Sequence, residues 1–514
     1  MRHHLPSPAI PGPGIASRIV CRIASGITCR ITSHIAAFYL SVTLIVTMAL
    51  PTGLSANDIR LPELGGSTSS IISQRQEYEL GQAWLKAFRR QVRTHHDPQL
   101  QRYLEQLVTR LALSSELKDR RFELVLINNP TINAFAVPGG VIGVHTGLFF
   151  YAESEHQLAS VLSHELAHLG QRHFARRLEL QRKTSLVSLA GLLAGLVLSA
   201  TVGGEAGMAA MSAAQAASMD TQLRYSRQNE QEADRMGLET LFRAGMDPAA
   251  TAAMFERMLA ATRYVGKRPP EFLLTHPLAE SRISDARGRI AKYPARQYLD
   301  NLEYHLMRVR SVLALEATPA LAAARFGNEL TGSSLSRQAA RYGLALAQSD
   351  MSEHAAARKT LAPLLVAEPE RFTYQLAAAT IERNAGKYPK AIKHLGKLAK
   401  EYPQNFVVQM ELAETLLKAN RYGESERILE TLSHQRPTDP KVWFELAEVS
   451  GLAGDISGVH LARAEYFILT GVFDKARNHL GYARKLVDQD FKQSALIEQR
   501  LRDVAAMEQR NKRL

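Results

Sequence analysis

Apolar side chains recur with the 3.6-residue period of amphipathic helices along most of the chain after residue 75. The longest stretches of this kind are residues 77–92, 98–115, 155–183 and 226–245. Two segments differ: residues 121–129 ("RFELVLINN") alternate as in a strand, and residues 131–150 read as a strand, a Pro-Gly-Gly turn and a second strand leading into a helix. The pattern predicts a mainly α protein whose first part is an α+β domain with a small β-sheet.

The last third of the chain carries an internal repeat of 34 residues. The columns that keep this period include Ala345, Ala379, Ala413 and Ala447, together with Pro369, Pro403 and Pro437 and with Leu361, Leu395 and Leu429. This pattern is similar to the tetratricopeptide repeat, in which paired antiparallel helices stack into a superhelix with a concave binding face. The spacing slips after residue 450, so we expect the final units to be irregular or to carry an insertion.

The first 56 residues have the order of a secretory signal peptide. No acidic residue precedes Asp58, an apolar run occupies 35–50, and small residues lead to Ala56, where cleavage is expected. An uncleaved anchor, or a start codon further along the chain, remains an alternative. Both cysteines, Cys21 and Cys29, lie in this leader, so the mature chain would have neither disulfides nor thiolate metal sites.

Net charge narrows the class of partner. The formal charge is +13, but beyond the leader the basic residues are scattered without a long run. This distribution argues against nucleic acid as a partner and is compatible with peripheral contact to anionic components of the cell envelope.

Residues 164–173, "HELAHLGQRH", contain the strongest chemical motif. His164 and His168 are four residues apart, so they project from one helix face and can bind one metal ion. Glu165 lies beside the first histidine, where it can face a water molecule without binding the metal. This is the H-E-x-x-H arrangement of zinc peptidases, in which the glutamate takes a proton from water.

His173 is a tempting third ligand, but the extended zinc motif places its third histidine one residue later. On a continuous helix His173 is also rotated away from His168. We therefore interpret it as a surface histidine or as one that supports a ligand from outside the metal's coordination shell.

A better third ligand lies in "NEQEAD" (229–234). Glu230 and Asp234 share a helix face, whereas Glu232 points elsewhere. Glu230 would bind the metal and Asp234 would orient a histidine ring. The alternative is that both are ordinary charges on a solvated helix.

"HELAH", "NEQEADRMG" and "NAFAVPGGVIGVHTGLF" together resemble the M48 family of zinc metallopeptidases over residues 75–310. The resemblance implies one zinc ion per chain. The implied ligands are His164, His168 and Glu230, the implied general base is Glu165, and Asp234 is a supporting acid sometimes described as a proton donor. The implied substrate-binding edge strand consists of Asn133, Ala134, Phe135 and Ala136, along which an extended peptide would lie.

The segment "THPL" includes His276, which the resemblance implies as a regulatory fourth ligand that keeps the enzyme latent. The alternative is a plain residue before a helix. Residues 186–202 are apolar but short for a membrane span, so we favour a lid over the active site and leave membrane insertion open.

Three domains follow: a signal peptide (1–56), a metallopeptidase domain (57–310) and a repeat domain (311–514). With this leader and these repeats, the chain is similar to periplasmic family members that act in outer-membrane assembly. We expect a periplasmic zinc endopeptidase with chaperone-like activity on misfolded or stalled outer-membrane proteins, and repeats that bind the β-barrel assembly machinery. The alternative is a repeat-based chaperone or adaptor with a largely latent zinc site. A third possibility, an integral-membrane processing protease, conflicts with the leader and the repeats.

Overall fold

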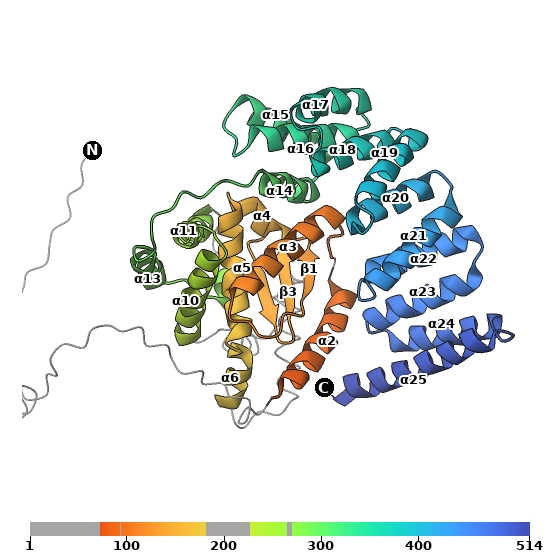
Figure 1. The fold of residues 1–514 in the computed structure, drawn as a ribbon. Coiled ribbons are helices and arrows are strands. Elements are labelled where there is room, and N and C mark those ends of the chain that lie inside the picture. Colours follow the sequence, from red (N-terminus) through yellow and green to blue (C-terminus); the bar gives the residue numbers. More distant parts are fainter. Residues whose placement is uncertain (1–71, 93, 181–226, 265–269, 514) are drawn as a thin grey trace, which may run out of the picture. The chain divides into compact units, whose positions relative to one another are not determined.

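The computed structural model describes residues 72–92, 94–180, 227–264 and 270–513 (Figure 1). The expected leader and the apolar segment 186–202 lie outside these residues. Within the described ranges, no helix combines the length and the apolar character that crossing a membrane requires. Helices dominate and the strands form one small sheet, which confirms the predicted mainly α fold.

The sheet has three strands in the order β1-β3-β2. β1 (Glu123–Ile127) pairs parallel with β3 (Val141–His145), and β2 (Ala134–Val137) pairs antiparallel with β3. The turn between β2 and β3 uses Gly139 and Gly140, both at positive φ, where a side chain would be strained. The strand–turn–strand pattern read from the sequence is confirmed.

Both faces of the sheet are covered. Helix α2 (Gln74–Gln91) packs on one face through Trp84 and Phe88. Helices α3 (Pro98–Ser114) and α5 (Glu155–Gly170) cover the other. Burial of the strands on both sides explains why β2 and β3 have no exposed alternate positions.

The helix predicted over 155–183 is interrupted. α5 ends at Gly170, a turn occupies residues 171 and 172, and α6 (His173–Leu180) starts afterwards. Arg172 takes a positive φ of 49° in this turn. A glycine followed by polar residues is a helix stop signal, which the apolar period alone did not reveal.

Helix α10 (Arg227–Arg243) packs closely along α5. A methyl group at Gly237 would lie 3.1 Å from the His164 backbone nitrogen, so a small residue is needed at this crossing. The remaining elements of this part are α4 (Thr146–Tyr151), α11 (Ala249–Tyr264), α12 (Glu271–Thr275) and α13 (Glu280–Ile290).

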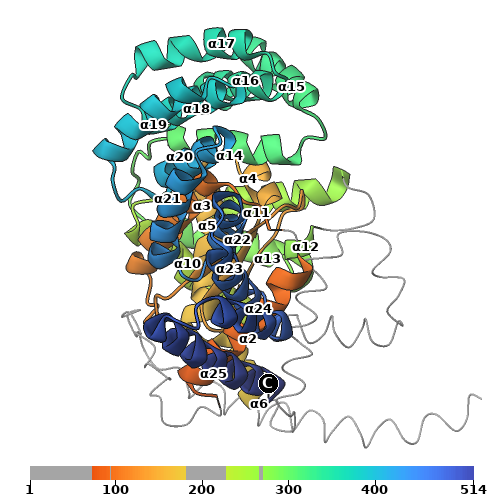
Figure 2. The same ribbon diagram turned by 90° about the vertical axis from the view of Figure 1, so that its right-hand side faces the viewer.

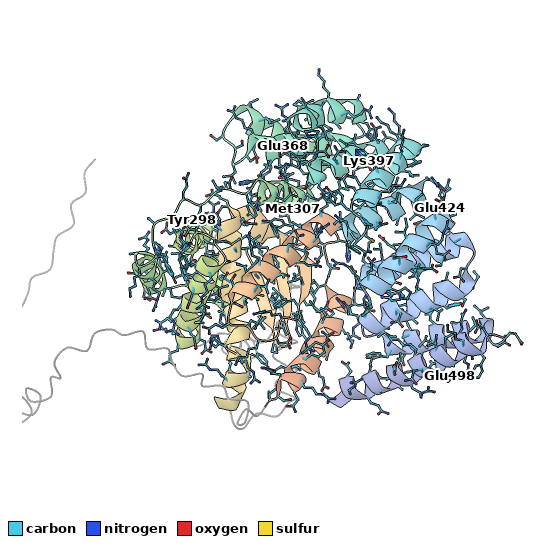
Figure 3. The ribbon with its side chains drawn as sticks, in the orientation of Figure 1. Tyr298, Met307, Glu368, Lys397, Glu424 and Glu498 are labelled. Atoms are coloured by element: carbon cyan, nitrogen blue, oxygen red, sulfur yellow. The ribbon has the colours of Figure 1, made fainter. Side chains whose placement is uncertain are left out.

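Helix α14 (Leu302–Leu315) joins the two parts of the chain. The Tyr304 hydroxyl donates to the Ala152 carbonyl at 2.8 Å, and Ser311 donates to that of Thr146 at 3.1 Å, which fixes α14 on α4. Met307, labelled in Figure 3, is buried in the same helix. The expected domain boundary between residues 310 and 311 lies inside α14.

The repeats are antiparallel helix pairs that follow one another in sequence (Figure 1). They comprise α15 (Pro319–Thr331), α16 (Arg337–Asp350), α17 (His354–Ala367), α18 (Phe372–Asn384), α19 (Tyr388–Glu401), α20 (Phe406–Lys418), α21 (Tyr422–Gln435), α22 (Pro440–Ala453), α23 (Ile456–Leu469), α24 (Phe473–Leu486) and α25 (Phe491–Arg513). The alanine and leucine columns of the repeat are buried between the helices.

The expected insertion after residue 450 is absent from these helices. α23 begins 34 residues after α21, because 456 − 422 = 34, and α24 and α25 follow without an extra element. Gly454 and Gly471 adopt positive φ in the turns around α23. Gly454 continues the column of Gly386, which also has a positive φ, and Gly471 takes the next position of the proline column. The sequence pattern changes at this point, whereas the helical arrangement continues.

The repeats contact the first part of the chain again through α20 and through Arg436, directly after α21, which Figure 2 shows from the side of the later repeats. Arg436 donates to both carboxylate oxygens of Glu105 on α3, at 2.8 and 2.7 Å. A cavity of about 800 Å³ lies between β1, the start of α3 and helices α20 to α22. Arg310 of α14 adds a largely buried ion pair, 2.6 Å long, with Asp97 at the N-terminus of α3.

Candidate metal centre

Helix α5 places two histidines and a glutamate at the centre of the first part of the chain. The helix begins at Ser154, whose side chain accepts from the Gln157 amide. His164 and His168 point their Nε2 atoms toward each other at 3.0 Å, as the four-residue spacing predicts. Both rings and the Glu165 side chain are buried.

Helix α10 supplies two carboxylates to the same place. The Glu230 oxygens lie 3.5 Å from Nε2 of His164 and 3.5 Å from Nε2 of His168. Asp234 lies on the other side of His164, with Oδ1 3.0 Å from Nδ1. Both carboxylates are buried, which excludes the solvated-helix alternative.

His276, directly after α12, completes a ring of four donors. Its Nδ1 lies 3.3 Å from His164 Nε2 and 3.1 Å from a Glu230 oxygen. Its Nε2 lies 3.4 Å from the Glu165 carboxylate. The structure therefore brings His276 to the ligand cluster.

These four side chains fit a metal ion. His164, His168, Glu230 and His276 each offer one atom, and these atoms lie within 4.8 Å of one another. A tetrahedral ion with bonds of about 2.0–2.1 Å separates its ligand atoms by about 3.3 Å. Five separations between these side chains, from 3.0 to 3.5 Å, are close to that edge length, and nitrogen and oxygen donors without sulfur suit zinc.

Arg282 on α13 is a member of the site that the sequence did not indicate. It donates to Asp234 from Nε at 2.7 Å and from Nη2 at 2.6 Å, and its Nη1 lies 2.9 Å from Glu230. Burial alone would raise the pKa of Asp234, but the hydrogen bonds from Arg282 and His164 hold that pKa below its usual range. In the sequence Arg282 is one of several charges on a polar helix, so no local signal distinguishes it.

Glu165 has the environment of a proton acceptor. Burial raises the pKa of its carboxyl above the ordinary value, although the charges of His276 and His164 oppose this effect. The backbone amide of Ala136 donates to the same carboxylate. The candidate base is thus tied to β2.

The expected substrate strand differs in detail from the sequence interpretation. β2 starts at Ala134, so Asn133 precedes it, and Asn133 Nδ2 lies 3.4 Å from Glu271 of α12. β2 is an edge strand of the sheet, as expected, and the side chains of Ala134, Phe135 and Ala136 are buried. The Phe272 amide of α12 donates to the Ile132 carbonyl just before this strand, so α12 lies against its start.

His173 is buried, which corrects the surface interpretation. The break in the helix at residues 171 and 172 returns its ring to His168, with their Nδ1 atoms 2.8 Å apart. Glu232 points away from the ligand cluster, as predicted, and contacts His173 instead.

Comparison with known proteins agrees with this arrangement. The family model "Peptidase family M48" matches residues 98–290, and a tetratricopeptide repeat model matches residues 383–447. The first match spans the sheet, α5, α10 and α13, and therefore includes every candidate ligand.

Three relatives illustrate the similarity. The Beta-barrel assembly-enhancing protease of Escherichia coli (strain K12) is 36% identical over 358 residues, which cover 69% of this chain and 73% of that protein. A "Putative beta-barrel assembly-enhancing protease" of Vibrio cholerae is 37% identical, covering 64% and 68%. The mitochondrial metalloendopeptidase OMA1 of Schizosaccharomyces pombe is 34% identical, covering 35% and 50%.

Proposed function

This chain belongs to peptidase family M48 and is a metalloendopeptidase, and we propose that it acts in the periplasm as a zinc enzyme on misfolded or stalled outer-membrane proteins. The observation that carries the proposal is the buried cluster of His164, His168, Glu230 and His276 beside the buried carboxylate of Glu165. A ring of metal donors next to a proton acceptor is the minimum that metal-assisted peptide hydrolysis requires.

His164, His168 and Glu230 would hold one zinc ion per chain. Bound zinc would make water easier to deprotonate and polarise the scissile carbonyl. Asp234 Oδ1 lies 3.0 Å from Nδ1 of His164, so a hydrogen on Nδ1 would leave the lone pair of Nε2 facing the other donors. Both oxygens of Asp234 are engaged with Arg282, so we assign Asp234 an orienting role in preference to proton donation.

Glu165 would take the proton of the attacking water and pass it to the leaving amine. Its raised pKa means that this carboxylate binds a proton more strongly than an ordinary glutamate does, which suits a group that must accept and then release a proton near neutral pH. The substrate would lie along β2, whose Ala136 amide already contacts this carboxylate.

The position of His276 favours a latent resting form. Catalytic zinc sites keep one coordination position open, whereas four protein ligands close the site. His276 would occupy the fourth position and also meets Glu165 at 3.4 Å. The second candidate function, a repeat-based chaperone or adaptor whose zinc site stays closed, is supported by this same contact.

Substrate and location rest on the relatives and on the repeats. The E. coli relative is named for enhancing β-barrel assembly, and tetratricopeptide repeats commonly bind other proteins. We propose that the repeats contact the β-barrel assembly machinery. We also propose a signal peptide at 1–56, a peptidase domain at 57–310 and a repeat domain at 311–514.

The Glu165→Gln variant tests the enzyme against the adaptor. Removing a general base should reduce kcat for cleavage of an unfolded outer-membrane protein about 10²–10⁴-fold, while zinc binding is retained. Glu153→Gln, at a half-exposed position before α5, is the matched control. If the wild type and Glu165→Gln protect the client from aggregation equally and neither cleaves it, the result favours the adaptor.

A further inference from the structure

His173 lies outside the ligand set but is fixed against it. Arg172, at φ 49°, turns the chain between α5 and α6 and is anchored on α2 and on Ile72, two residues before that helix. Its Nε donates to Glu77 at 3.1 Å and its Nη2 to the Ile72 carbonyl at 2.7 Å. This anchored turn places His173 Nδ1 2.8 Å from His168 Nδ1.

The other side of the His173 ring is also held. Nε2 lies 3.2 Å from a carboxylate oxygen of Glu232 on α10. Arg176 of α6 donates to the same oxygen at 3.0 Å. A continuous chain of contacts therefore runs from His168 through His173 to Glu232, and it connects the first two turns of α6 with α10.

The positions of the hydrogen atoms along this series of contacts follow from the groups at its two ends, the metal ligand His168 and the carboxylate of Glu232. A metal-bound His168 uses Nε2 as the ligand, so its Nδ1 carries hydrogen and needs an acceptor. His173 Nδ1 can accept only when hydrogen resides on its Nε2. Glu232, which can only accept when ionised, selects that tautomer because Nε2–H can then donate to it.

We infer that His173 is a positioning residue for the metal ligand His168, and that Glu232 sets the tautomer of His173. This inference rests on the proposed zinc site and extends it, since ligating histidines commonly donate their second N–H to an oriented acceptor. The usual acceptor is a carboxylate or carbonyl, whereas here an imidazole stands between ligand and carboxylate. Asp234 performs the direct form of this role for His164.

Two substitutions of His173 separate the hydrogen bond from simple packing. His173→Phe keeps an aromatic ring but removes the acceptor, and we expect it to weaken zinc binding about 10–100-fold. His173→Asn places Oδ1 near the position of Nδ1, so it can still accept from His168. We expect it to recover most of the lost affinity although it does not reach Glu232.

Variants of residues on α10 test the Glu232 end of this series of contacts. Glu230→Ala removes a proposed ligand and should reduce zinc affinity most. Glu232→Ala should reduce it less, and Glu239→Ala, a half-exposed site on the same helix whose partner is Arg243, should leave it unchanged.

The measurement is zinc affinity of the whole protein by competition with a chelator, with the absorption spectrum of the cobalt-substituted form as a second readout. The melting temperature of each metal-free variant checks folding. In a double-mutant cycle, His173→Phe should have almost no further effect once His168→Ala is present.

Two results would overturn the inference: unchanged zinc affinity and cobalt spectrum in His173→Phe, or equal losses in His173→Phe and His173→Asn. In either case a wild-type protein that binds zinc and cleaves its client leaves the proposed function intact. A wild-type protein that binds no zinc would instead remove the proposed function itself.

Discussion

The guanidinium of Arg282 donates to both carboxylate oxygens of Asp234, from Nε at 2.7 Å and from Nη2 at 2.6 Å. Breaking a buried pair of this kind by removing one partner costs about 3–5 kcal/mol, because the remaining charge stays buried without compensation. We expect Arg282→Met to lower the free energy of unfolding by about this amount and also to weaken zinc binding, since Asp234 would no longer be fixed against His164. Urea unfolding and chelator competition measure the two effects.

Arg287→Met is the matched control for this substitution. Arg287 lies on the same helix, but it is exposed and paired with the exposed Glu256. Such surface pairs contribute about 0–1 kcal/mol. Similar losses of stability in both variants would contradict the role of Arg282.

Gly237 permits the close crossing of α10 and α5. In Gly237→Ala a methyl group would meet the His164 backbone at 3.1 Å, so the helices must separate. Overpacking of this kind typically costs about 1–3 kcal/mol. We expect a lower melting temperature and weaker zinc binding, because Glu230 and Asp234 move with α10.

Gly288→Ala provides the comparison, since no atom lies within 4 Å of its added methyl group. Helix propensity alone predicts a gain of up to about 1 kcal/mol for alanine in a helix interior. A stabilising effect at both positions would show that the crossing tolerates a larger residue.

His276→Ala tests whether the fourth donor restrains the enzyme. The substitution leaves three proposed ligands and frees both a coordination position and Glu165. We expect cleavage of an unfolded outer-membrane protein to rise about tenfold if the closed form is favoured by about 1.4 kcal/mol. A double variant with Glu165→Gln should be inactive, and activity equal to or below wild type in His276→Ala would reject the latent form.

The buried pair of Asp97 and Arg310 predicts a dependence of stability on pH. Burial alone would raise the pKa of Asp97, but Arg310 and the Leu100 amide hold it below its usual range. The stabilising contribution is therefore fully present above the unfolded pKa of about 3.9 and is lost as pH falls through the lower folded value. Asp97→Asn keeps a residue that caps α3 well, so it isolates the charge.

We expect Asp97→Asn to lower the free energy of unfolding by about 3–5 kcal/mol at pH 7 and the difference from wild type to shrink below about pH 4. Asp119→Asn, at a half-exposed pair with Arg121, should change stability by less than about 1 kcal/mol. A difference that persists unchanged at acidic pH would show that the lost charge is not its cause.

Local pattern was sufficient for most elements of the fold. The helical period located α2, α3, α5 and α10, and the glycine pair after Pro138 located the turn of the sheet. The local pattern did not reveal that α14 packs against both the peptidase part and the repeats, because its contacts with α4 depend on residues far away in the sequence. The slip of the 34-residue spacing after residue 450 also suggested an irregular end of the repeats, although the helices continue there with glycine turns between them.

The residues of the site also divide into those that local spacing predicted and those that it did not. The spacing of His164, His168 and Glu165 on one helix, and the pairing of Glu230 with Asp234 on another, follow from helix geometry. Arg282 reaches Asp234 from a separate helix, so no periodicity encodes the contact. The burial of His173 depends on the turn at Arg172, which itself depends on α2.

Helix α14 is hydrogen-bonded to α4 on one side and packs against α16 on the other. The peptidase part and the repeats therefore share this helix in their cores and are not two modules joined by a linker. Chimaeras between relatives should therefore fold only when α3, α4 and α14 descend from the same parent. Because Arg436, directly after α21, also binds Glu105 of α3, recombination within this family would then have inherited the repeats up to α21 together with the catalytic half.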